Sequence, residues 1–190
     1  MSHIDDLQYS LDRSARPSVS AIHGNESMMI HIGFTGTRDG MSSDQLREVT
    51  RLAHELSRGH SVIAHHGCCV GSDAEFHRVL RRENAFMVGH PALGWPNGKL
   101  CAAVLCDFVE DPAPPMTRNQ AIVDAVSLCH DAGRDPGHLI ATPLCGTRQR
   151  RSGTWATIRM ALRSLRAGRL RELYVVGRDG ELLDHSGWGV

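Results

Sequence analysis

One stretch of the sequence combines the groups that bind anions. Residues 148–157 carry three arginines, followed by Ser152, Gly153 and Thr154. An apolar run at 139–143 precedes it, and apolar residues at helical spacing follow it. The N–H groups at a helix start lack internal partners, and the helix dipole is positive there. The stretch is therefore typical of a phosphate-binding helix start.

The same stretch also has a purely structural interpretation. Ser152 or Thr154 is then only the N-cap of the helix, and the arginines occupy a solvated turn. Both interpretations stay open at this point, and evidence from the other loops is needed to choose between them.

Apolar strands alternate with amphipathic helices along most of the chain. Five short runs are predicted to be strands, at 29–34, 61–65, 85–89, 138–142 and 172–176. Helix starts are marked by Ser/Thr residues with Glu or Gln three positions later, namely Ser42 with Gln45, Ser72 with Glu75, and Thr117 with Gln120. This pattern predicts an α/β fold, a Rossmann-like three-layer sandwich with a central, mainly parallel sheet.

The domain organisation is simple. Residues 1–28 are polar without a sustained period and are expected to form a mobile N-terminal extension, and residues 29–190 are expected to form a single Rossmannoid domain. The segment 91–115 is rich in proline and glycine, and we interpret it as a lid, with a short extra strand possible at 100–105.

Four loops follow the predicted strands, at 35–40, 66–71, from 90 to 119, and at 148–154. Ligands of open parallel sheets bind beyond the carboxyl ends of the strands. These loops hold glycines, hydroxyls, arginines and histidines, so we expect them to meet in one ligand site. Arg118 in particular has no acidic neighbour in the sequence, which favours a contact with a ligand.

Composition limits the partners and the location. The formal net charge is +0, which disfavours nucleic acid as the main partner. No apolar run is long enough to span a membrane, and the first residues do not resemble a signal peptide, so we expect a cytoplasmic protein without membrane contacts. The six cysteines are expected to be reduced there.

Four motifs in order resemble the SLOG superfamily, which includes the Lonely Guy phosphoribohydrolases, lysine decarboxylase-like nucleotide-binding proteins and the DNA-processing protein A fold. The motifs lie at 33–38, 66–74, 118–124 and 152–157, and the similarity runs from about Ile30 to Val176. The resemblance implies a site for a nucleotide or a nucleotide-derived ligand. The ligand-binding residues expected from the loops and the resemblance are Gly36, Thr37, Arg38, His66, Gly67, Arg118, Asn119, Arg151, Ser152, Gly153 and Thr154.

The chain departs from the Lonely Guy pattern Pro-Gly-Gly-x-Gly-Thr-x-x-Glu. Gly153 and Thr154 match its Gly-Thr, arginines replace the two earlier glycines, and Thr157 replaces the catalytic Glu. The departure favours a binding module that senses or sequesters a nucleotide. The alternative is an N-glycosidic hydrolase acting on a nucleotide, with Asp73 or Glu75 as the catalytic carboxylate. By analogy with related folds, we also expect a homo-oligomer.

The run His65-His66-Gly67-Cys68-Cys69 raises two further possibilities, a zinc site and a thiolate nucleophile. Adjacent residues at a strand end point in different directions, and no second pair has the spacing of a zinc finger. Small cysteines that pack against a loop explain Cys68 and Cys69 equally well. We therefore expect no metal and no cofactor.

Overall fold

A computed structural model of the chain describes residues 28–93, 105–131, 137–146, 149 and 151–188. In this part of the chain, six parallel strands form one sheet in the order β4-β3-β2-β1-β5-β6. The strands are β1 Met29–Gly36, β2 Ser61–His66, β3 Phe86–Gly89, β4 Phe108–Val109, β5 His138–Thr142 and β6 Glu172–Val175. The helices are α1 Ser43–Ser57, α2 Ser72–Arg82, α3 Pro115–Asp131 and α4 Gly153–Arg166.

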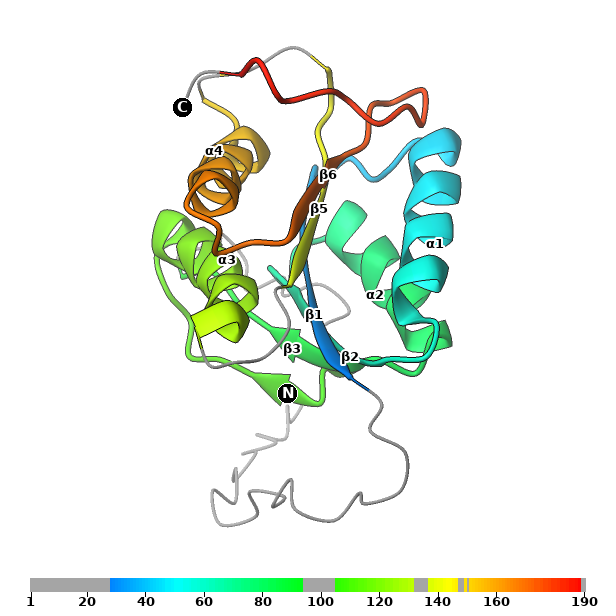
Figure 1. Ribbon diagram of the computed structural model, residues 1–190, viewed down its shortest axis with the longest axis vertical. Helices are drawn as coiled ribbons and strands as arrows, with labels where there is room; N and C mark the ends of the chain where they lie inside the picture. The colour runs from blue at the N-terminus through cyan, green and yellow to red at the C-terminus, as the bar shows by residue number, and fades with distance from the viewer. Residues whose placement is uncertain (1–27, 94–104, 132–136, 147–148, 150, 189–190) are drawn as a thin grey trace, which may run out of the picture.

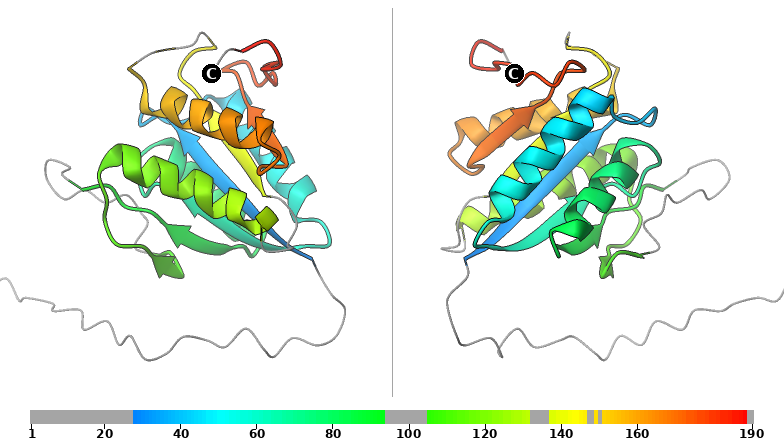
Figure 2. Two further views of the ribbon diagram at one scale, coloured as in Figure 1. Left: turned by 60° about the vertical axis from the view of Figure 1, so that its left-hand side comes forward. Right: turned by 90° about the vertical axis from the view of Figure 1, so that its right-hand side faces the viewer.

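The molecule has three layers. Helices α1 and α2 cover one face of the sheet, and α3 and α4 cover the other (Figures 1 and 2). The predicted Rossmann-like sandwich is thus confirmed, and the sheet is entirely parallel among the described strands. In that part of the chain, no helix has the length and hydrophobicity required to cross a bilayer.

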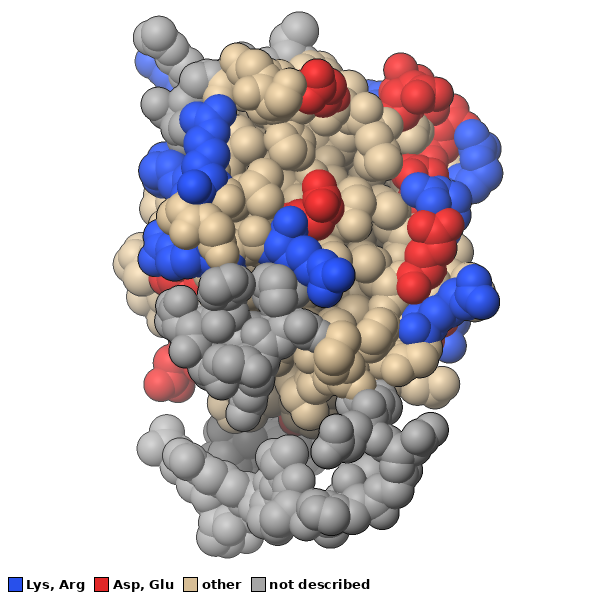
Figure 3. Space-filling view, in the orientation of Figure 1, with Lys and Arg blue, Asp and Glu red and all other residues tan. Residues whose placement is uncertain are grey.

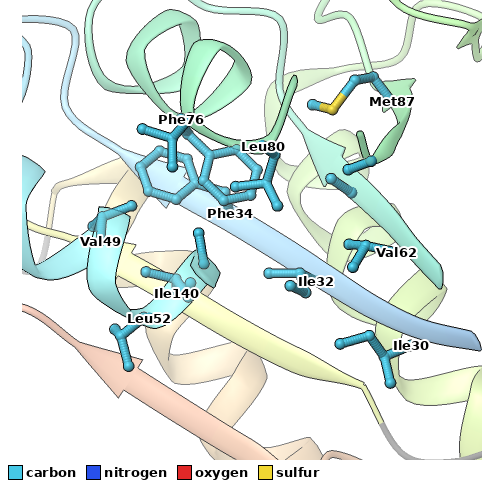
Figure 4. Close-up of a cluster of buried hydrophobic side chains, with 14 of the residues drawn as sticks. Ile30, Ile32, Phe34, Val49, Leu52, Val62, Phe76, Leu80, Met87 and Ile140 are labelled. Carbon is cyan, nitrogen blue, oxygen red and sulfur yellow. The ribbon is translucent and has the colours of Figure 1, made fainter. Parts of the chain in front are cut away.

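Both faces of the sheet are apolar because helices cover both of them. Ile30, Ile32 and Phe34 of β1 point toward α1 and α2, where the rings of Phe34 and Phe76 stack with centroids 4.4 Å apart (Figure 4). On the opposite face, Leu139 packs with residues of α3 and α4, among them Trp155. The predicted strands therefore hold the core, and the polar loops are left at the strand ends.

The start of α1 follows the sequence prediction. The hydroxyl of Ser42 accepts from the N–H of Gln45, and the Gln45 side chain accepts from the N–H of Ser42, both at 3.0 Å. On the outer face of the helix, Arg51 pairs with Glu48 and Glu55, each at 2.6 Å. Figure 3 shows acidic and basic side chains interspersed over α1, as expected of a solvated face.

Two predicted capping boxes are wrong. Gly71 is the N-cap of α2 and offers no side chain, and Ser72 lies inside the helix. Helix α3 begins at Pro115, so Thr117 also lies inside its first turns, and the Gln120 amide donates to Asp124 instead. In both places, proline or a positive-φ glycine ends the preceding loop before the hydroxyl residue is reached.

Two other predictions depend on residues that lie largely outside the described ranges. These are the extension at 1–28 and the extra strand at 100–105. The structure has a different short strand, β4, which was not predicted because two residues carry no detectable period.

Candidate functional site

The strand order changes direction between β1 and β5. Gly36 ends β1 and is paired with Thr142, which ends β5. Ligands of folds with this strand order bind outside the carboxyl ends at such a switch point. A Cβ at Gly36 would overlap the Cβ of Ser72 and lie 2.5 Å from the Thr142 hydroxyl, so only glycine fits there.

The N-terminus of α4 is held at this switch point. The Thr154 hydroxyl donates to the carbonyl of Gly36 at 2.9 Å, and the Ser152 hydroxyl accepts from the N–H of Trp155 at 3.4 Å. Ser152 is therefore the N-cap, as the structural interpretation required. Gly153 is exposed, and among the described residues only the Asn119 amide lies within 4 Å of its Cβ position. Capping and ligand approach are thus compatible here.

The β1–α1 loop and α3 complete this side of the site. The carbonyl of Thr37 accepts from the N–H of Ser72 at 3.0 Å, and the Asn119 amide donates to the carbonyl of Gly153 at 3.5 Å.

The predicted ligand-binding residues at this edge differ in exposure. Asn119 is buried, whereas Arg38 and Arg151 are exposed. Arg148 and Arg150 lie outside the described residues. The described parts of the expected loops therefore lie at one edge of the sheet.

The guanidinium group of Arg118 lies against Gly67. A Cβ at Gly67 would overlap Nη1 of Arg118, which explains why the loop has glycine at this place. The other terminal nitrogen, Nη2, donates to Sγ of Cys69 at 3.4 Å, and Nη1 lies 3.9 Å from Oδ2 of Asp73. Sequence reasoning missed this acidic neighbour, because it is brought to Arg118 by the fold. The ion pair therefore gives Arg118 a structural role whether or not it also contacts a ligand.

Asp73 is buried beneath the 66–71 loop. Its Oδ2 accepts from the N–H of Cys69 at 3.1 Å. Burial raises the pKa of Asp73, while the charge of Arg118 and hydrogen bonds from N–H groups of the loop act in the opposite direction. The carboxylate therefore fastens the loop and Arg118 to the start of α2.

Glu75 is used elsewhere. Its Oε2 accepts from the N–H of Met41 at 2.7 Å, and its carboxylate lies against Gly40, which has a φ of 87°. Glu75 thus anchors the end of the β1–α1 loop. Of the two candidate catalytic carboxylates, only Asp73 lies beside Arg118 and Gly67.

The histidines at the strand ends form two separate groups. His66 is fully buried and turns its imidazole toward His77, so its side chain takes no part in the loop surface. His65 points to the opposite face, where it bonds His31 at 3.0 Å and His90 at 3.1 Å. Burial lowers the pKa of His65 well below its usual value and that of His90 to about 4, so both are neutral near pH 7.

Two buried hydroxyls and one thiol add to the chemistry of the site. Within the described residues, the hydroxyls of Ser72 and Thr142 beside Gly36 have no hydrogen-bond partner. The switch point therefore carries more polar groups than the fold itself uses. Burial and the charge of Asp73 raise the pKa of Cys69, which disfavours this residue as a thiolate nucleophile.

Comparisons with known proteins bear on the fold. No family model and no curated protein matches the sequence. DNA processing protein A from Streptococcus pneumoniae is similar in structure, with a TM-score of 0.51, 16% identity, and coverage of 82% of this chain and 52% of that one. The chain thus corresponds to about half of that protein.

Two weaker similarities were also found. The structural-genomics target TM1055 has a TM-score of 0.43 and 12% identity, covering 70% of this chain and 68% of that chain. The Moco carrier protein of Chlamydomonas rheinhardtii has a TM-score of 0.33 and 19% identity, covering 80% and 92%. At 16% identity, the similarity to DNA processing protein A shows a shared fold, the Rossmann-like α/β sandwich that was expected from the sequence.

Proposed function

We propose that the protein binds a nucleotide or a nucleotide-derived ligand at the switch point, with a phosphate group against the start of α4. The observation that carries this proposal is the 2.9 Å hydrogen bond from Thr154 to Gly36, because it fixes the helix N-terminus beyond the ends of β1 and β5. Helix N–H groups and the helix dipole favour an anion at that place. The exposed side chain of Arg151 supplies positive charge beside it.

Binding without turnover, in a sensor or a sequestering module, is the better supported function. Thr157, which stands where the Lonely Guy enzymes have their Glu, is fully buried and donates to the carbonyl of Gly153 at 3.1 Å. Glu75 is bonded to the backbone of Met41. Among the carboxylates named here, only Asp73 supports the alternative, nucleotide N-glycosidic hydrolysis, and it is buried in contacts with the loop and Arg118.

The test is incubation of the purified protein with a mixture of nucleotides, followed by mass spectrometry of the bound and released fractions. Intact nucleotide in the bound fraction supports the proposal, whereas free base with ribose phosphate supports the hydrolase. A single-stranded oligonucleotide is included because one structural neighbour is named as a DNA processing protein. Retention of the oligonucleotide alone would replace the proposal by nucleic-acid binding.

Two variants localise the phosphate. Arg151→Ala should weaken nucleotide binding about 5- to 50-fold, the effect of losing one charge-assisted contact. Arg163→Ala is the matched control, since this exposed arginine lies near the other end of the same helix. Equal affinities of the two variants would show that the phosphate does not bind at the start of α4.

We also propose that the protein is a homo-oligomer. The sheet edge at β4 exposes Phe108 and Val109, and Phe86 at the start of the neighbouring strand β3 is also exposed. An exposed apolar strand edge commonly pairs with another chain. Light scattering on a size-exclusion column measures the mass directly, and a monomer across the accessible concentrations would contradict this proposal.

A further inference from the structure

A second cluster of reactive groups lies beneath the 66–71 loop. Nε2 of His66 is 3.0 Å from Nδ1 of His77, and Sγ of Cys106 is 3.5 Å and 4.0 Å from these two nitrogens. All three atoms lie within 4.8 Å of one another. Both histidines are buried, and Cys106 is half-buried.

The three side chains come from three separate parts of the fold. His66 is the last residue of β2, His77 lies in α2, and Cys106 precedes β4. None of these residues lies next to another in the sequence. Their convergence is therefore a tertiary feature, which the spacing of histidines and cysteines along the chain did not reveal.

The distances fit a tetrahedral metal. With Zn–N bonds of about 2.0–2.1 Å and Zn–S bonds of about 2.3 Å, tetrahedral angles place two nitrogens about 3.3 Å apart and a nitrogen about 3.6 Å from a sulfur. The observed separations are 3.0 Å between the nitrogens and 3.5 Å and 4.0 Å from nitrogen to sulfur. We propose that His66, His77 and Cys106 bind a zinc ion, with Cys68 as the fourth ligand.

Cys68 borders the cluster, but its Sγ is not among the atoms that lie within 4.8 Å of one another, so it has to move closer to become a ligand. Its φ of 53° is in the left-handed region, and its side chain is buried against Cys106. A Cβ at Gly89 would lie 2.6 Å from Sγ of Cys68 and 3.1 Å from Sγ of Cys106, so the glycine makes room for both sulfurs. Two cysteines and two histidines are a common ligand set of structural zinc sites.

Metal binding changes which atoms of the cluster carry protons. Nδ1 of His66 accepts from the N–H of Cys68 at 3.2 Å, so the ring proton is assigned to Nε2. Zinc at Nε2 requires that proton on Nδ1, and the Cys68 amide must then rotate away. Each thiol that becomes a thiolate ligand releases its proton to solvent. The ion with two thiolates and two neutral imidazoles has no net charge, which suits a buried site.

The site would be structural. Four protein ligands leave no open position for a substrate. The ion would tie the end of β2 to α2 and to the edge strand β4, and it would fix the loop on which Gly67 meets Arg118. This inference is independent of nucleotide binding, because none of its four ligands is required to contact the nucleotide.

The first test measures the metal itself. Protein purified with a reductant is analysed for zinc by mass spectrometry, and the chelated protein is then titrated with Co²⁺. We expect one metal per chain and the absorption of tetrahedral Co²⁺ with a thiolate charge-transfer band. The absence of that band in the folded wild-type chain would overturn the proposal.

Three single substitutions assign the ligands. Cys106→Ser and His77→Gln should lower zinc affinity by more than about a hundredfold, since even changes around the ligands cost 10- to 100-fold. Cys68→Ser should weaken the charge-transfer band by removing one of two thiolates. Cys145→Ser is the matched control, as this cysteine lies after β5 and contacts Gln149.

Thermal unfolding with and without zinc distinguishes a variant that has lost the metal site from one that is misfolded. The wild type and Cys145→Ser should gain thermal stability with zinc, whereas Cys106→Ser should unfold at one temperature in both conditions. Equal zinc affinity of Cys106→Ser and Cys145→Ser would show that the cluster is a hydrogen-bonded group and not a metal site.

Discussion

The hydroxyl of Thr154 donates to the carbonyl of Gly36 across 118 positions of sequence, and it joins the start of α4 to the end of β1. This bond determines where the helix dipole points. Because the ends of β1 and β5 flank the strand-order switch, the positive end of α4 faces the place where folds of this class bind ligands.

Thr154→Val should therefore cost about 1–2 kcal/mol of unfolding free energy, since the partly buried carbonyl of Gly36 loses its donor, and it should also weaken nucleotide binding. Thr157→Val is the matched control, because its hydroxyl donates within the helix, to the carbonyl of Gly153. Urea unfolding and nucleotide titration check both variants. An equal loss of nucleotide binding in both variants would show that the Thr154 hydroxyl has no specific role in the site.

Gly36→Ala should destabilise the fold by about 1–3 kcal/mol, the usual cost of overpacking. The added methyl group would overlap Ser72 and lie 2.5 Å from the Thr142 hydroxyl. Gly187→Ala, where no described residue lies within 4 Å of the Cβ position, serves as the control and should be nearly neutral. If Gly36→Ala is equally neutral in urea unfolding, the close approach at the switch point does not hold in solution.

Arg118→Ala should cost about 1–3 kcal/mol, because it leaves the buried carboxylate of Asp73 without its cation. The double variant Arg118→Ala/Asp73→Asn should lose less unfolding free energy than the two single variants together. Urea unfolding of all three variants measures this coupling between the two side chains. Arg51→Ala, which removes exposed ion pairs, is the comparison and should cost less than about 1 kcal/mol. Strict additivity would mean that the two side chains do not interact.

The protein should lose stability in mild acid. The folded-state pKa of His90 is about 4, below the usual 6.5 of histidine, so the unfolded chain binds a proton first as the pH falls. Its contribution is complete above about pH 6.5, declines toward pH 4, and amounts to about 3 kcal/mol. Unfolding free energies measured across this range should fall less steeply in His90→Asn. An unchanged slope in His90→Asn would contradict this prediction.

Local patterns predicted much of the fold. The apolar runs at 61–65 and 138–142 match β2 and β5 within one residue, because strands buried on both faces must be apolar throughout. The capping box of Ser42 and Gln45 was equally readable, since both partners lie within one helical turn. At Ser72 and Glu75 the same pattern failed, because Met41, distant in sequence, takes the Glu75 carboxylate.

The candidate site was likewise predictable only in part. The sequence by itself determined that loops with glycines, hydroxyls and arginines follow the strands, and parallel strands bring their carboxyl ends to one edge. Only the tertiary structure decided which groups touch: Thr154 with Gly36, Arg118 with Asp73, and His66 with His77 and Cys106. The reason is that these contacts join residues from separate elements, whose approach depends on how whole helices pack on the sheet and leaves no period or spacing in the chain.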